Sequence, residues 1–206
     1  MSTKKNSSTS ISSCFTDDSI KSTKVKKINE INEINEINDT APKQSNQFYP
    51  DVTYAKILIH ILNENKKLND YYERIEKAND GNFTYKVKPG ISLLDYLRRI
   101  IKYTKIEFST LILSMIYIDR ICEKKVFLNE YNIHRIMFIS IIMAYNYNED
   151  RLFDNKYLSL VSGVSLKEML ALEHDFLDLI EFNLYVNNSD FEKYKQYFFL
   201  DLSEFD

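Results

Sequence analysis

The most constraining feature of this sequence is the stretch SMIYIDRICEKKVFLNEYNIHRIMFISIIMAY at residues 114–145, which is almost wholly apolar. Asp119, Arg120, His134 and Arg135 nevertheless lie inside it. Its longest apolar run, 136–145, has about half the length that a membrane-spanning helix needs. A helix that is apolar on nearly every face is surrounded by other helices. The stretch therefore predicts the central buried helix of a small all-helical globule.

Composition agrees with an all-α fold. The chain has 206 residues, of which 44% are apolar, enough for one core with a tail. Only three Gly and three Pro occur, and this scarcity favours long helices over a turn-rich sheet.

Charge and cysteine content restrict the function classes. The net charge of -3 argues against a nucleic-acid or membrane-surface binder, which is usually basic on one face. A disulfide is not expected between Cys14, in a polar region, and Cys122, in an apolar run. No hydrophobic stretch marks a secretory signal in 1–27, and Ser2 stands where a myristoylation signal needs Gly. These features predict a protein of the nucleus and/or cytoplasm.

Residues 1–47 are rich in Ser, Thr, Lys and Asn and predict a disordered, low-complexity tail. Within it, INEINEINEIND at 28–39 repeats every three residues, so that on a helix its Ile positions drift by about 60° per repeat. The repeat is either filler or a transient helix on a partner. The cluster KSTKVKK at 21–27 is either a solvated charge run or a nuclear import signal.

Apolar spacing and turn residues predict the helices. An N-terminal helix is expected over 54–78, within a segment 54–80 that ends near Gly81. The compact part then predicts helices near 92–103, 106–122, 130–147, 155–161 and 166–182. Short connections mean that consecutive helices pack against each other.

Helix starts carry capping signals. SLLD at 92–95, TKIE at 104–107 and SLKE at 165–168 each fit a capping box, in which side chains satisfy the free amides of a first turn. Asn129 is the expected cap of the central helix.

Three charged positions need partners if they are buried. Arg99 on the helix at 92–103 and Asp119 on the next helix are predicted to form a structural ion pair. Glu173 falls in an apolar stripe on the helix at 166–182. Its carboxylate needs either an internal partner or a partner protein. The other members of that stripe are Leu166, Met169, Leu170, Leu177 and Ile180.

Taken in order, several motifs resemble the single cyclin box of the P-type cyclins, also called U-type. They are LLDYLRRIIKY, YIDRI, LNEYNIHRIMF and DNKYLSLVSGVSLKEMLALEHDFLDLIEFNLYV. The resemblance covers about 91–190 and implies a five-helix cyclin box at 91–190. The extra helix at 54–80 precedes it, and a C-terminal extension at 191–206 follows.

The resemblance implies a regulatory subunit, without enzymatic activity or a cofactor, that binds a cyclin-dependent protein kinase in a 1:1 heterodimer. Its kinase-binding residues would be Asn146, Asp150 and Glu173. Asn146 stands where the family pattern has Lys, and an amide cannot make the charged contacts that a Lys makes. His134 and Arg135 match the family's HR pair; Arg135 is expected to anchor a loop carbonyl, and the three His residues have no metal-ligand spacing.

Two alternatives remain at this point. One is a transcription-type cyclin-box scaffold, against which the single box and the negative net charge count. The other is a cyclin-fold scaffold that has lost kinase activation, which the Asn at position 146 favours. No phosphate loop or nucleophile constellation points to an enzyme.

Overall fold

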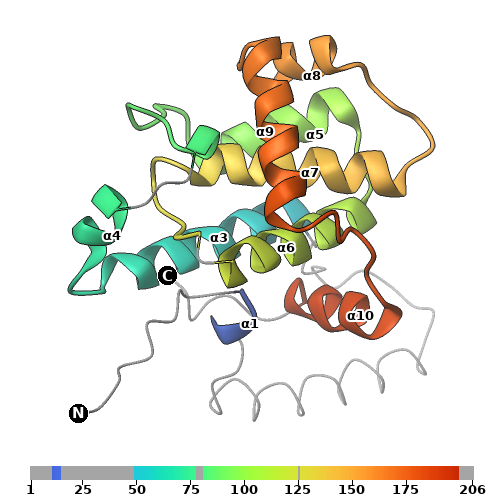
Figure 1. Ribbon diagram of the computed structural model, residues 1–206. Coiled ribbons are helices and arrows are strands. Elements are labelled where there is room, and N and C mark those ends of the chain that lie inside the picture. The colour runs from blue at the N-terminus through green and yellow to red at the C-terminus, as the bar shows by residue number, and fades with distance from the viewer. Residues whose placement is uncertain (1–10, 15–48, 78–80, 125, 200–206) are drawn as a thin grey trace, which may run out of the picture.

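The computed structural model describes residues 11–14, 49–77, 81–124 and 126–199, and within these ranges it contains helices and no strand. The fold is therefore all-α, as expected (Figure 1). The elements in chain order are α1 (Ile11–Cys14), α3 (Pro50–Lys66), α4 (Tyr71–Lys77), the short 3-10 helix η1 (Gly81–Phe83), α5 (Leu93–Thr104), α6 (Phe108–Glu123), α7 (Ile133–Asn148), α8 (Asn155–Ser162), α9 (Leu166–Leu179) and α10 (Asn188–Tyr197).

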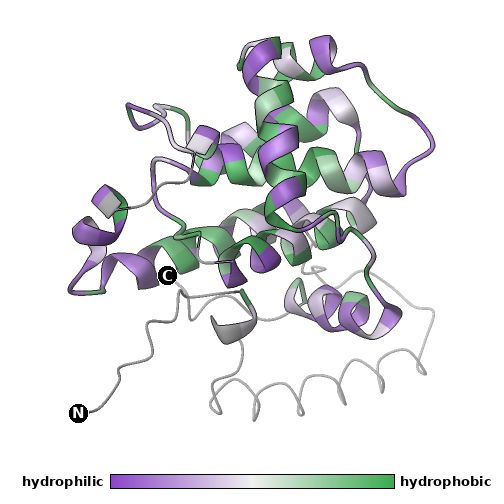
Figure 2. Cartoon of the chain, in the orientation of Figure 1, coloured by the Kyte–Doolittle hydropathy of each residue, from purple (hydrophilic) through white to green (hydrophobic). Residues whose placement is uncertain are grey.

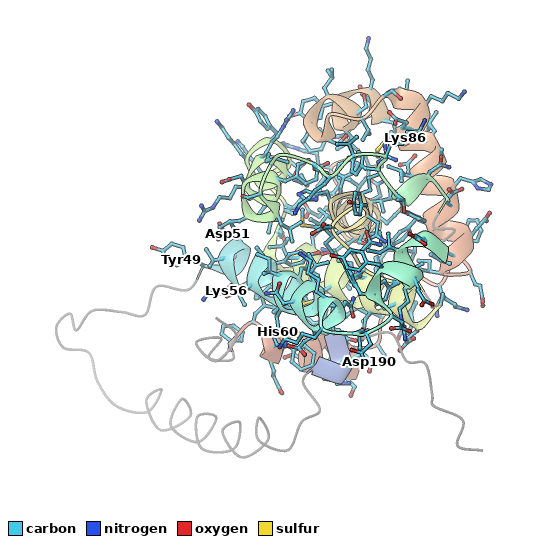
Figure 3. The ribbon with its side chains drawn as sticks, turned by 90° about the vertical axis from the view of Figure 1, so that its left-hand side faces the viewer. Tyr49, Asp51, Lys56, His60, Lys86 and Asp190 are labelled. Atoms are coloured by element: carbon cyan, nitrogen blue, oxygen red, sulfur yellow. The ribbon has the colours of Figure 1, made fainter. Side chains whose placement is uncertain are left out.

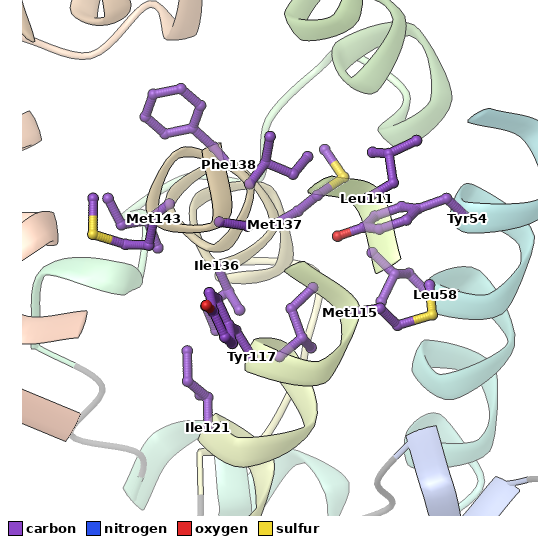
Figure 4. Close-up of a cluster of buried hydrophobic side chains, with 14 of the residues drawn as sticks. Tyr54, Leu58, Leu111, Met115, Tyr117, Ile121, Ile136, Met137, Phe138 and Met143 are labelled. Carbon is purple, nitrogen blue, oxygen red and sulfur yellow. The ribbon is translucent and has the colours of Figure 1, made fainter. Parts of the chain in front are cut away.

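Helix α7 forms the centre of the molecule. Every residue from 136 to 145 is buried, and so is every residue from 110 to 119 on the neighbouring α6. Figure 4 shows Ile136 and Met137 of α7 on the side of α6 and α3, and Phe138 on the other side of α7. In Figure 2 the hydrophobic colouring follows these inner helices, whereas the outer α4 and α10 are mainly hydrophilic. The prediction of a central helix surrounded by others is confirmed.

One predicted capping box is complete, and a second has only its N-cap hydrogen bond. The hydroxyl of Ser92 accepts a hydrogen bond of 3.1 Å from the backbone N–H of Asp95 and begins α5. Ser165 and Glu168 satisfy each other's backbone amides at the start of α9. Gly163 ends α8 with φ +77, the left-handed conformation that a helix C-terminus commonly adopts.

Two other cap predictions are wrong. Thr104 is the last residue of α5 and donates its hydroxyl proton to the carbonyl of Ile100, so it does not start α6. Asn132 precedes α7 in place of the expected Asn129. The side chain of Asn129 instead accepts from the N–H of Tyr131 and shapes the turn before the helix.

The predicted helix at 54–78 is two helices, and the first begins earlier than expected. α3 starts at Pro50, where the ring's missing N–H costs no hydrogen bond, and a turn at 67–70 separates it from α4. Near this turn, the buried amide of Asn65 donates to the carbonyl of Leu128 and ties the last turn of α3 to the segment before α7. Residues 78–80 lie outside the described residues.

α3 belongs to the core rather than standing apart from it. Tyr54 is fully buried, and its hydroxyl shares a hydrogen bond of 2.9 Å with that of Ser114 on α6. Burial raises the pKa of Tyr54, with the Ser114 bond opposing the rise. Asp51 pairs with Arg98 on α5 at 2.8 Å. Figure 3 shows Tyr49, Asp51, Lys56 and His60 along the outer side of this helix.

The expected disordered tail at 1–47 lies outside the described residues except for 11–14, and with it lie the Ile repeat and the Lys cluster. At 11–14 the expectation is wrong, because these residues form α1 and Ile11 is fully buried. At the other end, α10 begins at Asn188 and packs on α6.

No helix in the described part of the chain is both long and apolar enough to cross a membrane.

Candidate partner-binding surface

Helix α9 presents two different faces. Its inner face is buried against the core by Met169, Leu172 and Phe176. On the outer face, Leu166 and Leu170 are exposed. The apolar stripe expected around Glu173 is therefore divided, with Met169 and Ile180 serving the core and the two Leu residues facing solvent.

Glu173 is half-buried between these faces. Its Oε2 accepts a hydrogen bond of 2.7 Å from the side-chain amide of Asn155, at the start of α8. Burial raises the pKa of the Glu173 carboxyl above its ordinary value, and the Asn155 bond opposes that rise. Among the described residues no Lys, Arg or His forms an ion pair with Glu173. The internal partner is therefore a neutral amide, and the carboxylate charge stays uncompensated.

Asn146 and Asp150 are both exposed, Asn146 in the last turn of α7 and Asp150 in the loop that follows. Figure 1 shows α9 crossing in front of α7, which ends at the start of that loop. Glu149, between them, is occupied differently, because it accepts hydrogen bonds from the Thr110 hydroxyl and the Glu107 amide on the α6 side. The end of α7 is thereby fixed while Asn146 and Asp150 face solvent.

A turn after α9 adds aromatic surface that the sequence motifs did not single out. Glu181 and Phe182 have φ of 55° and 56°, a left-handed conformation that non-Gly residues adopt at a cost of about 1–2 kcal/mol each. The side chain of Phe182 is 65% exposed, and that of Tyr185 is also exposed. A pair of consecutive left-handed residues holding an aromatic ring in solvent points to a role outside the isolated fold.

Side chains of α6 hold this turn in place. The Tyr117 hydroxyl donates to the carbonyl of Leu184 at 2.7 Å. The Arg120 guanidinium donates to the carbonyls of Asn183 and Tyr185. Side chains of one helix thus satisfy three successive carbonyl groups, and these bonds hold the turn against α6.

Tyr147 lies near the end of α7. Burial is the main cause of a raised pKa at Tyr117, Arg120 opposes it, and the nearby phenol of Tyr147 adds to it. Tyr147 itself is 50% exposed. We use the name α7–α9 face for a set of exposed or half-buried residues. They are Asn146 and Tyr147 at the end of α7, Asp150 just after it, Leu170 and Glu173 on α9, and Phe182 in the turn that follows α9.

The predicted Arg99–Asp119 ion pair does not form. Arg99 is exposed on α5 and donates to the carbonyl of Leu160 on α8. Asp119 is buried on the opposite side of the core, where it accepts from the backbone N–H of Ile11 and the hydroxyl of Tyr194. The prediction failed because α1 and α10, which supply these donors, were expected to be tail and extension.

His134 and Arg135 brace the loop before α5. His134 Nε2 lies 3.0 Å from the carbonyl oxygen of Ile91, and burial lowers the pKa of its imidazole. Arg135 donates to the carbonyl of Asn82 and pairs with Glu168 at 2.9 Å, which confirms the expected loop anchor. Within the described residues no group of His, Cys, Asp and Glu side chains could hold a metal ion.

Comparison with known proteins agrees with this architecture. The family model described as Cyclin matches residues 17–184. Cyclin-U4-3 of Arabidopsis thaliana is 35% identical over 150 residues, covering 72% of this chain and 67% of that protein. Cyclin-P4-1 of Oryza sativa subsp. japonica is 36% identical over 109 residues, covering 52% of this chain and 51% of that protein. Cyclin-P3-1 of the same rice subspecies is 29% identical over 155 residues, covering 74% of this chain and 65% of that protein.

Three observations agree with one another. Helix α7 is central and enclosed by its neighbours, the motifs lie in order at 91–190, and the family match covers most of the sequence. The chain belongs to the cyclin family, and its similar relatives include U-type and P-type cyclins.

Proposed function

We propose that this chain binds and activates a cyclin-dependent serine/threonine protein kinase, as one regulatory subunit per kinase, in the control of cell division or related signalling. Membership of the cyclin family supports a regulatory role. In this proposal the phosphoryl-transfer chemistry belongs to the kinase, and the chain contributes binding energy.

The observation that carries the proposal is Glu173. Its carboxylate is half-buried beside exposed Leu170, and its hydrogen-bond donor is the neutral amide of Asn155. Closing a partner over this surface would remove more water from the charge, which is unfavourable unless the partner supplies a cation. The α7–α9 face therefore suits a protein surface that combines apolar side chains with a Lys or Arg.

The proposed mechanism is a shift between two kinase conformations. A kinase is active when a Glu on its regulatory helix pairs with the Lys of its ATP site. Packing that helix against the α7–α9 face would favour the inward position. The effect on activity is then set by how much more tightly the chain binds the active conformation than the inactive one.

Asn146 favours a second candidate function, a cyclin-fold scaffold without kinase activation. An exposed amide in the last turn of α7 can donate and accept hydrogen bonds but brings no charge to the contact. If the kinase contact requires a cation at this position, the chain would use its surface for another protein.

Affinity purification separates the two functions. The tagged full chain is purified from its native cells beside Glu173→Arg, and the bound proteins are identified by mass spectrometry. Asp178→Arg is the matched control, because it makes an acid-to-Arg change at an exposed position on a different side of α9. Circular dichroism establishes that all three chains are folded.

A kinase that accompanies the wild type and Asp178→Arg but not Glu173→Arg supports the proposal. A kinase that also accompanies Glu173→Arg shows that binding uses another surface. If no kinase accompanies the folded wild type, the scaffold function replaces the kinase-regulator function.

We also propose that the complex resides in the nucleus and/or the cytoplasm. Imaging of a fluorescent fusion in the native cells tests this directly, and a fusion confined to a membrane-bounded secretory compartment would overturn it.

A further inference from the structure

Asp119 is the most deeply buried acid described in the chain, with a side chain only 2% exposed. Its Oδ1 accepts a hydrogen bond of 2.7 Å from the N–H of Ile11, and its Oδ2 accepts one of 3.2 Å from the N–H of Ser12. The hydroxyl of Tyr194 on α10 also donates to Oδ2. One carboxylate thus joins α1, α6 and α10.

Helix α1 depends on this contact for its existence. Four residues are far too few for a helix to be stable in water, because nucleation is unfavourable and only elongation compensates for it. The side chain of Ile11 is fully buried, and α1 packs against α3 and α6. Among the described contacts, the helix is held by the buried Ile11 side chain and by the hydrogen bonds to Asp119.

α1 is distant from α3 along the chain, because residues 15–48 stand between them. A peptide of that number of residues has a contour length far greater than the width of a small domain. Chain length alone therefore does not tie the position of α1 to that of α3.

Ser12 is a position at which added negative charge would oppose docking. It is half-buried, its N–H donates to Asp119, and its side chain hydrogen-bonds with the hydroxyl of Tyr194. A phosphate on Ser12 would bring close to two negative charges beside a buried carboxylate. Repulsion between like charges in such poorly hydrated surroundings is far larger than between exposed groups.

We propose that Ser12 is a phosphorylation site that controls the docking of α1. A protein serine/threonine kinase would act on the undocked segment, transferring the γ-phosphoryl group of ATP to Ser12 Oγ. The Oγ–P bond forms, the bond to the leaving ADP breaks, and the hydroxyl proton passes to solvent. The modified segment then cannot dock again, which leaves Asp119 and the Ile11 socket open to solvent or to another protein.

The first test measures docking in the full chain by hydrogen exchange at the amides of Ile11 and Ser12. Phosphoserine installed at position 12 and the variant Ser12→Glu should speed this exchange at least about tenfold, since like charges at this range repel well above thermal energy. Ser12→Gln is the matched control, because it has the size of Glu without the charge, and it should stay within about threefold of the wild type.

The second test places the same changes in Asp119→Asn, which removes the charge. Asn keeps an acceptor oxygen for only one of the two amides, so Asp119→Asn alone is the baseline for this comparison. In this background Ser12→Glu should speed exchange no more than Ser12→Gln does. Charge-controlled docking would be overturned if Ser12→Glu changed the exchange rate equally in both backgrounds. It would also be overturned if Ser12→Glu and Ser12→Gln changed the exchange rate equally in the wild-type background. Phosphopeptide mapping of the chain from its native cells must find phosphate on Ser12; recovery of this peptide only in unmodified form would overturn the modification.

Discussion

The side-chain amide of Asn155 donates a hydrogen bond of 2.7 Å to Oε2 of Glu173, joining the first turn of α8 to the middle of α9. This bond fixes the carboxylate at the boundary between the core and the exposed Leu170. Because the donor is neutral, it orients Glu173 without neutralising it. The α7–α9 face therefore carries an oriented negative charge that a partner can meet.

The raised pKa of Glu173 predicts a change in how stability depends on pH. Burial is the main cause of the rise above 4.5, so the folded protein holds this proton more tightly than the unfolded chain does. The contribution of Glu173 to the free energy of unfolding is complete below the pKa of Glu173 in the unfolded chain. It is lost as the pH rises through the pKa of Glu173 in the folded protein. The stability of the wild type relative to Glu173→Gln should therefore fall from about pH 4.5 upward and then level off. Urea unfolding of both proteins measures this, and parallel profiles would contradict it.

The left-handed conformation of Phe182 predicts that Phe182→Gly separates stability from partner binding. Gly adopts φ near 56° without strain, and the ring is mostly exposed, so little buried area is lost. The isolated variant should keep a free energy of unfolding within about 1 kcal/mol of wild type, while kinase affinity falls at least about tenfold. Glu181→Gly is the control, because it relieves the same kind of conformation and leaves the ring in place. Equal kinase affinity for the two variants would remove Phe182 from the interface.

The bond between Tyr117 and Leu184 predicts a defined loss of stability. Tyr117→Phe removes the hydroxyl that satisfies the Leu184 carbonyl and should cost about 1 kcal/mol, or a fall in Tm of about 2–4 °C for a chain of this size. Tyr72→Phe serves as the control, since Tyr72 is 78% exposed. Thermal unfolding by circular dichroism measures both, and a Tm for Tyr117→Phe no lower than that of the control would show that the turn is held without this bond.

The two glycines Gly163 and Gly90 predict opposite responses to the same substitution. An added Cβ meets nothing within 4 Å at either position, but only Gly163 has a positive φ, +77°. Gly163→Ala should therefore destabilise by about 1–2 kcal/mol through backbone strain alone. Gly90→Ala should be neutral or slightly stabilising, because it reduces the freedom of the unfolded chain. Chemical denaturation measures the free energy of unfolding of both variants. Equal changes in this free energy would contradict the prediction that the positive φ of residue 163 disfavours Ala.

Local signals in the sequence were enough to predict most of the helical core. Ser92 and Ser165 begin α5 and α9 because each side chain accepts from the backbone N–H three positions later, and these bonds involve only neighbouring residues. The apolar surface of α7 likewise required that it be central, whatever packed around it. Such features depend on short stretches of chain, and a sequence displays them directly.

The failures involve contacts between distant segments. Asp119 was paired with Arg99 because a buried acid needs a partner and Arg99 was available, whereas its donors come from 108 positions earlier and 75 later. Thr104 fits a capping pattern but sits where α5 still continues. The sequence does not indicate Phe182, because its exposure follows from the left-handed turn at 181–182. Tyr117 and Arg120 hold that turn through hydrogen bonds to its carbonyl groups. No local pattern records which distant helix will hold a turn.

The most direct test of the account is the phosphoryl-transfer activity of the copurified kinase, measured with and without this chain on a generic Ser/Thr peptide. We expect the kinase to be nearly inactive alone, to gain at least about tenfold activity with the wild type and Asp178→Arg, and to gain none with Glu173→Arg. Binding of the wild-type chain without any gain in activity would contradict the account, and would make this cyclin a scaffold for its kinase.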